Sequence, residues 1–138
     1  MPDGIDLIVA DHQMVNDLFA EFAATGQGGP VGQIVDALKA HDEAEQFALY
    51  PLAATLLSNT AVLERAEAAH SLVKRQIDVV LALEGPALVA AVGELQALVQ
   101  RHVADEETKL LPALRQAATP EQLDELGARI LQIKQRVG

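Results

Sequence analysis

Two stretches of the sequence carry the same pattern of histidine, glutamate and proline: His41–Pro51 and His102–Pro112. Glu45 follows the histidine of the first stretch by four positions and Glu106 does so in the second, and all three shared residues repeat at an interval of 61 positions. Residues four apart lie one turn above each other on one face of an α-helix. Each stretch would therefore present an imidazole and a carboxylate to the same space, which is a spacing suited to metal ligands.

The composition restricts the chemistry that such ligands could support. The chain has no cysteine, which excludes zinc–thiolate sites and iron–sulfur clusters and leaves nitrogen and oxygen as ligand atoms. Its formal charge of −10 would repel nucleic acid and anionic lipid surfaces. No apolar run reaches the roughly 18 to 20 residues of a membrane span, and the amino terminus is acidic rather than basic. We therefore expect a cytoplasmic protein that binds neither nucleic acid nor membranes.

The rest of the sequence indicates the helices that would position these ligands. Half of the 138 residues are apolar, only 3% are aromatic, and glycine and proline fall at a few clustered places, which predicts one all-α domain over residues 1–138. Four helices between about residues 3 and 115 would form an up-down-up-down bundle. A short fifth helix, about residues 120–136, would begin with a capping box from Thr119 to Gln122 and pack outside the four.

The boundaries of the four bundle helices follow from hydrophobic spacing and from breaks. The glycine-rich segment 25–30 separates the first helix from the second, Ser58–Thr60 begins the third, and Gly85 with the following proline separates the third from the fourth. Pro51 and Pro112 should kink the ends of the second and fourth helices, whose inner faces continue to Leu52 and Ala113.

The two remaining histidines, His12 and His70, lie within apolar stripes of the first and third helices. With a rise of about 1.5 Å per residue, the bundle places all six candidate ligands between about 8 and 15 Å along its axis. Six such groups would be costly to bury alone, but one metal pair bridged by two carboxylates would satisfy them, and this donor set favours iron or manganese. The candidate metal ligands are His12, His41, Glu45, His70, His102 and Glu106.

At these residues the sequence resembles the hemerythrin-like HHE cation-binding domain family. The family signature has a histidine on the first helix, H-x-x-x-E on the second, a histidine on the third and H-x-x-x-E on the fourth, and the resemblance covers Asp3 to about Arg115. It implies two iron ions, Fe²⁺ or Fe³⁺, with an oxo or hydroxo bridge as an option. By this resemblance, one iron is bound by His12 and His41, the other by His70 and His102, and Glu45 with Glu106 bridges them.

The sequence departs from the oxygen-carrying members of the family at Lys74, where carriers have a second histidine on the third helix. This departure argues against reversible oxygen carriage. Either one iron keeps an extra open position, or Glu67 fills it, since Glu67 lies three residues before His70 on the same helix. Tyr50 is a further alternative. Helical rotation turns it about 180° from His41, so packing is its favoured role, although a kink at Pro51 could bring it back.

These observations lead to three hypotheses about function. The favoured one is a non-heme di-iron protein that binds or reacts with O₂, peroxide or nitric oxide, with weak catalase or peroxidase activity as the preferred form. The alternative is an iron- or oxygen-sensing or storage module that binds without turnover and acts through a protein partner that the sequence does not identify. The third is a structural bundle without metal, which leaves the register of six ligands unexplained.

Overall fold

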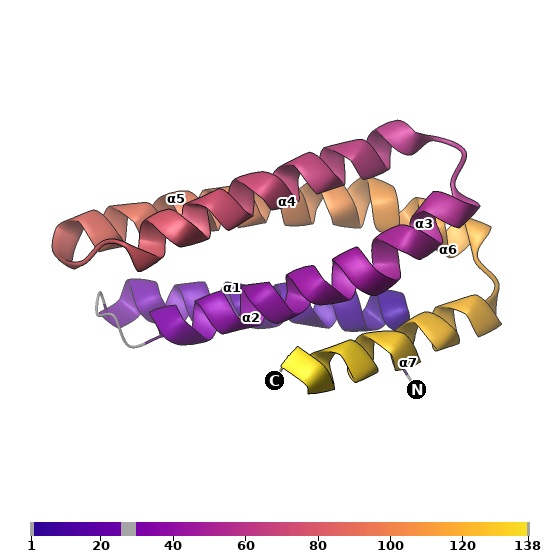
Figure 1. Ribbon diagram of the computed structural model, residues 1–138, viewed down its shortest axis with the longest axis horizontal. Coiled ribbons are helices and arrows are strands. Elements are labelled where there is room, and N and C mark those ends of the chain that lie inside the picture. Colours follow the sequence, from indigo (N-terminus) through magenta and orange to yellow (C-terminus); the bar gives the residue numbers. More distant parts are fainter. Residues whose placement is uncertain (1, 26–29, 138) are drawn as a thin grey trace.

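The computed structural model describes residues 2–25 and 30–137, and helices that run back and forth along one long axis make up nearly all of them (Figure 1). The predicted break at residues 25–30 falls mostly on residues 26–29, which lie outside the described residues. In chain order the elements are α1 (Gly4–Thr25), α2 (Val31–Ala44), η1 (Glu45–Leu49), α3 (Tyr50–Leu56), α4 (Thr60–Leu81), α5 (Gly85–Asp105), η2 (Glu106–Leu110), α6 (Leu111–Ala117) and α7 (Pro120–Val137).

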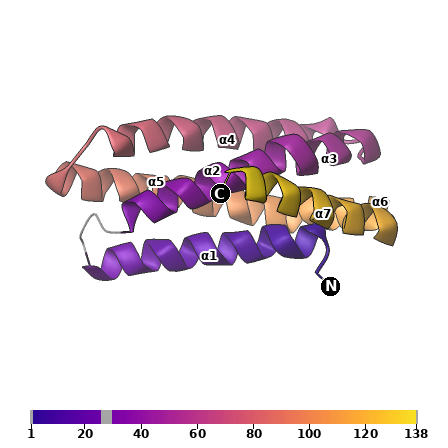
Figure 2. The same cartoon turned by 60° about the horizontal axis from the view of Figure 1, so that its bottom comes forward.

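These elements form the predicted up-down-up-down bundle with an added helix. The segments α2, η1 and α3 are continuous and make one rod, as do α5, η2 and α6, so the rods of the bundle are α1, α2–α3, α4 and α5–α6. Helix α7 lies along α1 and α2, outside the four rods (Figure 2). The all-α fold and the external fifth helix are thus confirmed. No helix in residues 2–25 or 30–137 is both long and apolar enough to cross a membrane.

Local capping explains where several helices begin. The backbone N–H of Gln122 donates to the Thr119 hydroxyl at 3.1 Å, and the Thr119 N–H donates back to the Gln122 side chain at 2.9 Å, which is the predicted capping box. Asn59 caps α4 by accepting from the N–H of Ala61 at 3.1 Å. Gly85, with φ of +65°, makes the turn that opens α5, a conformation that glycine adopts without steric cost.

Two apolar cores occupy the two halves of the bundle, and a layer of buried polar residues lies between them. Each large side chain that is fully buried in these cores stabilises the fold by about 1.5–3 kcal/mol. The core under α7 includes Ile5, Ile8, Ala48, Leu49, Ala53, Leu110, Leu114, Leu126 and Ile130. The core toward the α4–α5 turn includes Val15, Phe19, Phe22, Ile34, Leu38, Ile77, Val80, Leu95 and Val99. The buried polar residues are Asp11, His12, His41, Glu45, His70, His102 and Glu106.

Both rods that contain an internal proline widen into one π-helical turn just before it, where the sequence predicted a kink. The Tyr50 N–H donates to the Glu45 carbonyl, five residues back, whereas a regular α-helix would use the carbonyl four residues back. Pro51 has no N–H to offer the Phe47 carbonyl, and Arg129 of α7 donates to that carbonyl instead, at 3.1 Å.

The extra residue in each π turn moves the buried face of the following helix by one position. The predicted inner residues Leu52 and Ala113 are only partly buried, whereas Ala53 and Leu114 are fully enclosed. A prediction from hydrophobic spacing assumes 3.6 residues per turn throughout. It therefore places the buried residues of α3 and α6 one position too early in the sequence.

Candidate metal centre

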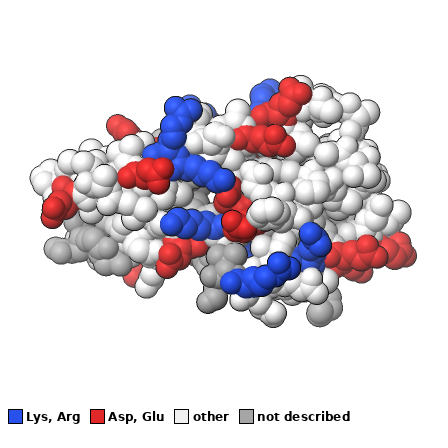
Figure 3. All heavy atoms as spheres, viewed as in Figure 1, with Lys and Arg blue, Asp and Glu red and all other residues white. Residues whose placement is uncertain are grey.

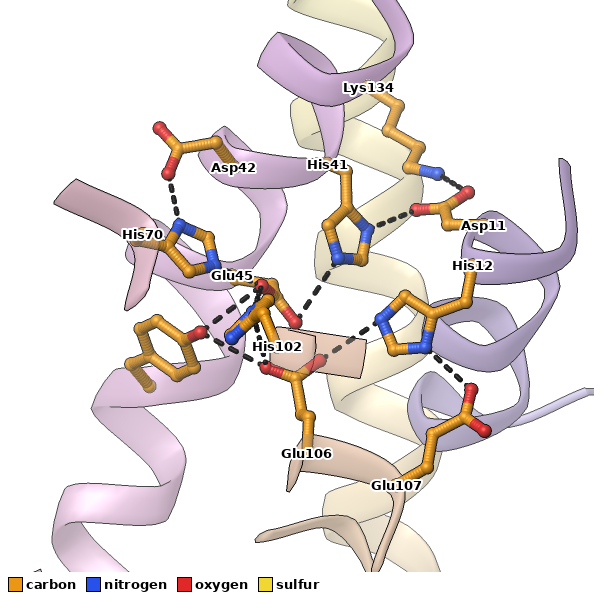
Figure 4. Close-up of polar contacts among 11 residues, drawn as sticks. Asp11, His12, His41, Asp42, Glu45, His70, His102, Glu106, Glu107 and Lys134 are labelled. Carbon is orange, nitrogen blue, oxygen red and sulfur yellow. Dashed lines mark hydrogen bonds and ion pairs between the residues drawn. The ribbon is translucent and has the colours of Figure 1, made fainter. Parts of the chain in front are cut away.

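The structure brings all six predicted ligands together in the layer between the two apolar cores (Figure 4). Their candidate ligand atoms form two groups of four, and within each group all atoms lie within 4.8 Å of one another. Glu45 and Glu106 belong to both groups. The first group consists of His12, His41, Glu45 and Glu106, and the second consists of Glu45, His70, His102 and Glu106.

Each ligand reaches the layer from a different point of the bundle. His12 and His70 come from the middle parts of α1 and α4, where they occupy positions of the buried stripe. His41 lies in the last turn of α2 and His102 in the last turn of α5. The two glutamates are the first residues of the π turns, so both widened turns begin at the site. Such single π turns frequently occur at functional sites.

Every imidazole turns its Nε2 atom toward a glutamate carboxylate. These distances have the length of hydrogen bonds or ion pairs, so the four rings converge on the two carboxylates. The Nε2 to oxygen distances are 3.1 Å from His12 to Glu106, 3.3 Å from His41 to Glu45, 2.5 Å from His70 to Glu45, 3.2 Å from His102 to Glu106 and 3.5 Å from His102 to Glu45.

Three of the four rings have a second carboxylate behind them, at Nδ1. Glu107 lies 2.7 Å from His12 Nδ1, Asp11 lies 3.0 Å from His41 Nδ1, and Asp42 contacts His70 Nδ1. Because an ionised carboxylate only accepts hydrogen bonds, Nδ1 must carry a proton in these pairs. In a neutral imidazole the lone pair is then on Nε2, facing the centre, which is the arrangement that metal-ligating histidines show.

Two of the three outer carboxylates are paired with lysines in turn. Lys134 of α7 contacts Asp11, so the external fifth helix reaches the site through the partner of His41. Lys74 of α4 lies 3.3 Å from Asp42 and is exposed. The sequence did not identify the three outer carboxylates or Lys134, although each acidic residue directly precedes or follows a predicted ligand.

Tyr50 lies inside the site, as the alternative of a kink at Pro51 allowed, and not turned away from His41 as regular helical rotation and the favoured packing role predicted. Its hydroxyl is 3.2 Å from Glu45 Oε1 and 3.1 Å from Glu106 Oε2, so it can donate its proton to either carboxylate. The π turn causes this placement, because a residue five positions after Glu45 lies one π turn further on the same face. A regular period of 3.6 residues does not place Tyr50 here, and only the proline beside it indicated this position.

Glu67, the other expected addition, is not brought to the cluster. Its side chain is exposed on α4, and Ala66 occupies the buried position one turn before His70. A residue three before His70 is offset by about 60° around the helix, and that offset directs Glu67 to solvent.

The charges of the site shift the pKa values of several of its residues in the absence of metal. Burial lowers the pKa of His41, but the Glu45 charge and the bonds to Asp11 and Glu45 outweigh burial and raise it to about 10. Burial likewise lowers the pKa of His102, while Glu106 and Glu45 raise it to about 9. Burial raises the pKa of Glu45, but the neighbouring imidazoles overcome this and hold it well below its usual range. Protons on the His41 and His102 rings therefore balance buried negative charge.

Four atoms of the first group lie at ion-pair distance, His12 Nε2 from Glu106 Oε1 at 3.1 Å and His41 Nε2 from Glu45 Oε2 at 3.3 Å, yet none of them makes a hydrogen bond within the described part of the chain. In a buried space, polar atoms without hydrogen bonds are costly. A metal ion that takes nitrogen and oxygen ligands would satisfy all four. The residues present therefore fit a metal cation, and the second group offers the same donor types.

Comparisons with known proteins agree with this geometry. A profile of the hemerythrin HHE cation binding domain family matches residues 3–114. A protein of Nostoc sp. named DNA nickase is 32% identical over 143 residues, which cover 96% of this chain and 40% of that protein. The chain thus spans less than half the length of this relative. This chain also superimposes on the crystal structure of a hemerythrin HHE cation-binding domain-containing protein from Mycobacterium kansasii, with a TM-score of 0.86 and 19% sequence identity. The superposition includes 99% of this chain and 88% of the Mycobacterium kansasii chain.

Proposed function

The chain belongs to the hemerythrin HHE cation-binding domain family, and on this premise we propose that it is a non-heme di-iron protein that binds or reacts with O₂, peroxide or nitric oxide. Weak catalase or peroxidase activity is the reaction we favour. The observation that carries the proposal is the pair of four-residue ligand groups that share two glutamates. His12 and His41 would hold one ion, His70 and His102 the other, and Glu45 with Glu106 would reach both.

An iron pair supplies redox chemistry, because two ions can together exchange two electrons with a small oxidant. The residues of the chain supply orientation and protons. Asp11, Asp42 and Glu107 fix the orientation of three rings through Nδ1, and partners of this kind raise the basicity of a ligand. The Tyr50 hydroxyl is placed to donate a hydrogen bond beside both carboxylates, and burial followed by the two glutamate charges raises its pKa. Tyr50 therefore keeps its proton at neutral pH.

A second candidate is a sensing or storage module that binds iron or oxygen without turnover. The relative named DNA nickase favours it, because the region similar to this chain forms only 40% of that longer protein. The formal charge of −10 opposes contact with a nucleic-acid backbone, so the proposal for this chain does not include DNA cleavage.

Iron loading followed by peroxide assay tests the proposal and separates the two candidates. The reconstituted chain should hold two irons and consume hydrogen peroxide, and Glu45→Ala should abolish both properties. Glu67→Ala is the matched control, because Glu67 is an exposed glutamate on α4. Full iron content without peroxide consumption would favour the module, and an equal loss in the Glu67→Ala control would contradict the assignment of ligands.

A further inference from the structure

A cavity of about 460 Å³ lies inside the bundle next to the imidazoles. Residues from α1, α2, α4 and α5 line it, so it occupies the space between the four rods on the side of the metal layer toward the α4–α5 turn. His12, His41, His70 and His102 all contribute to its surface. Its apolar walls are formed by Val15, Leu38, Val73, Ile77, Val99 and Val103.

The cavity is far larger than a diatomic ligand requires. A water molecule occupies about 30 Å³ of liquid, and an apolar cavity of about 150 Å³ can hold benzene. The volume instead falls in the range of about 300–1,000 Å³ that is usual for pockets that bind organic molecules. Most of its wall is aliphatic, so an apolar group of several carbon atoms would gain the most by entering.

The rim of the cavity does not select for an ion of either sign. Lys39 and Lys74 stand there with the acidic residues Asp42, Glu43 and Asp78, and Lys74 is already paired with Asp42 at 3.3 Å. Figure 3 likewise shows basic and acidic side chains side by side on the face that Figure 1 presents. A ligand with an apolar body and no net charge suits this entrance.

We propose that the cavity binds an uncharged organic hydroperoxide, with its carbon chain against the valine-rich walls and its peroxide end toward the imidazoles. The choice of a hydroperoxide rests on the proposed peroxide-reactive function, whereas the apolar, uncharged character of the ligand rests on the cavity itself. The chain would then favour a bulky hydroperoxide over hydrogen peroxide, because only the former fills the cavity.

Titration calorimetry with cumyl alcohol, the unreactive alcohol of cumene hydroperoxide, tests the binding step without peroxide chemistry. The full chain, before and after iron loading, should bind one equivalent with a negative heat-capacity change, which marks the burial of apolar surface. Val73→Phe fills part of the cavity and should weaken binding at least tenfold. Val79→Phe is the matched control, because Val79 is exposed on the same helix outside the cavity, and it should bind as the parent does.

The second measurement compares the rates at which the chain consumes cumene hydroperoxide and hydrogen peroxide. The assay contains ascorbate as reductant, because converting a hydroperoxide into its alcohol and water consumes two electrons and two protons. In the iron-loaded chain, Val73→Phe should lower kcat/KM for cumene hydroperoxide at least tenfold more than kcat/KM for hydrogen peroxide. Val103→Phe, on the neighbouring helix α5, repeats the test if Val73→Phe does not fold. Absence of alcohol binding, or equal binding by the parent and both filled variants, would overturn the inference even if hydrogen peroxide is consumed. If the chain binds the alcohol but reacts with neither peroxide, the proposed function is wrong, whereas the apolar binding site is supported.

Discussion

The two halves of the candidate metal centre use the same ligand types but are held differently. In the half formed by His12 and His41, both rings have a carboxylate at Nδ1, and Lys134 of α7 secures one of these carboxylates. In the half formed by His70 and His102, only His70 has such a partner among the described residues, and the lysine beside that carboxylate, Lys74, is exposed. We infer that the His12/His41 half anchors metal and the His70/His102 half accommodates a change of ligand. The His12/His41 half would then be the rigid part of the site and the His70/His102 half the reactive part.

Removal of a shared glutamate should have the largest effect, because each glutamate belongs to both halves of the centre and its loss disables both. Glu45→Ala leaves the rings of His41 and His70 without a central carboxylate and leaves the ring of His102 with Glu106 alone. We expect loss of both metals and a fall of about 3–5 kcal/mol in the free energy of unfolding of the metal-free chain, as for other broken buried ion pairs. Elemental analysis and urea unfolding measure the two effects. Wild-type iron content in Glu45→Ala would rule out its shared role.

The metal-free chain should lose stability as pH rises, and both halves contribute to this loss. The folded pKa values of about 10 for His41 and about 9 for His102 lie above the ordinary histidine value of 6.5. Such groups stabilise the fold fully below pH 6.5, and their contribution is lost as pH rises through the folded values. The melting temperature without metal should therefore fall between pH 6.5 and 10, whereas metal affinity should rise as protons leave the ligands. A flat profile without metal would show that the rings are not paired with buried carboxylates.

Substitution of the outer carboxylates distinguishes the halves directly. Asp11→Asn should weaken metal binding in the His12/His41 half, and Asp42→Asn should do so in the His70/His102 half. Loss of such a partner typically costs about 10–100-fold in metal affinity. Competition with a chelator should therefore remove one metal per chain before the other in each variant. If Asp11→Asn and Asp42→Asn lose the same metal first, the halves are not independent.

Addition of an imidazole to the less constrained half should have the smallest effect on metal content but a measurable effect on rate. Lys74 lies one turn after His70, so Lys74→His places a ring on the same side of α4. We expect unchanged iron content, slower consumption of hydrogen peroxide and slower autoxidation of the reduced centre. Lys39→His adds a histidine elsewhere on the cavity rim and serves as the control. Unchanged rates in Lys74→His at full iron content would show that the extra ligand position is already filled.

Periodicity and repetition were sufficient to predict the six residues that form the core of the site. Apolar residues at helical spacing placed His12 and His70 on inner faces, and both are buried there. The repeated H-x-x-x-E pattern placed two carboxylates at one level, and short connections required antiparallel rods. These are properties of single helices and of their order, which sequence patterns express directly.

What the sequence did not reveal depends on departures from regular helix or on contacts between helices. The π turns add one residue to each rod and bring Tyr50 to the glutamates, a shift that a period of 3.6 residues cannot express. Asp11 is adjacent to His12 in the chain but serves His41, because neighbours on a helix point about 100° apart and so face different rods. An acidic residue beside a predicted ligand on a buried helix face was the available signal.

The central claim is that one chain holds two metals in ligand groups that share two glutamates. Anomalous diffraction at the iron absorption edge, from crystals of the iron-loaded chain, measures this directly. We predict two iron peaks in the polar layer, one beside His12 and His41 and the other beside His70 and His102, with Glu45 and Glu106 between them. A single peak in that layer, or iron peaks elsewhere on the bundle, would contradict the account.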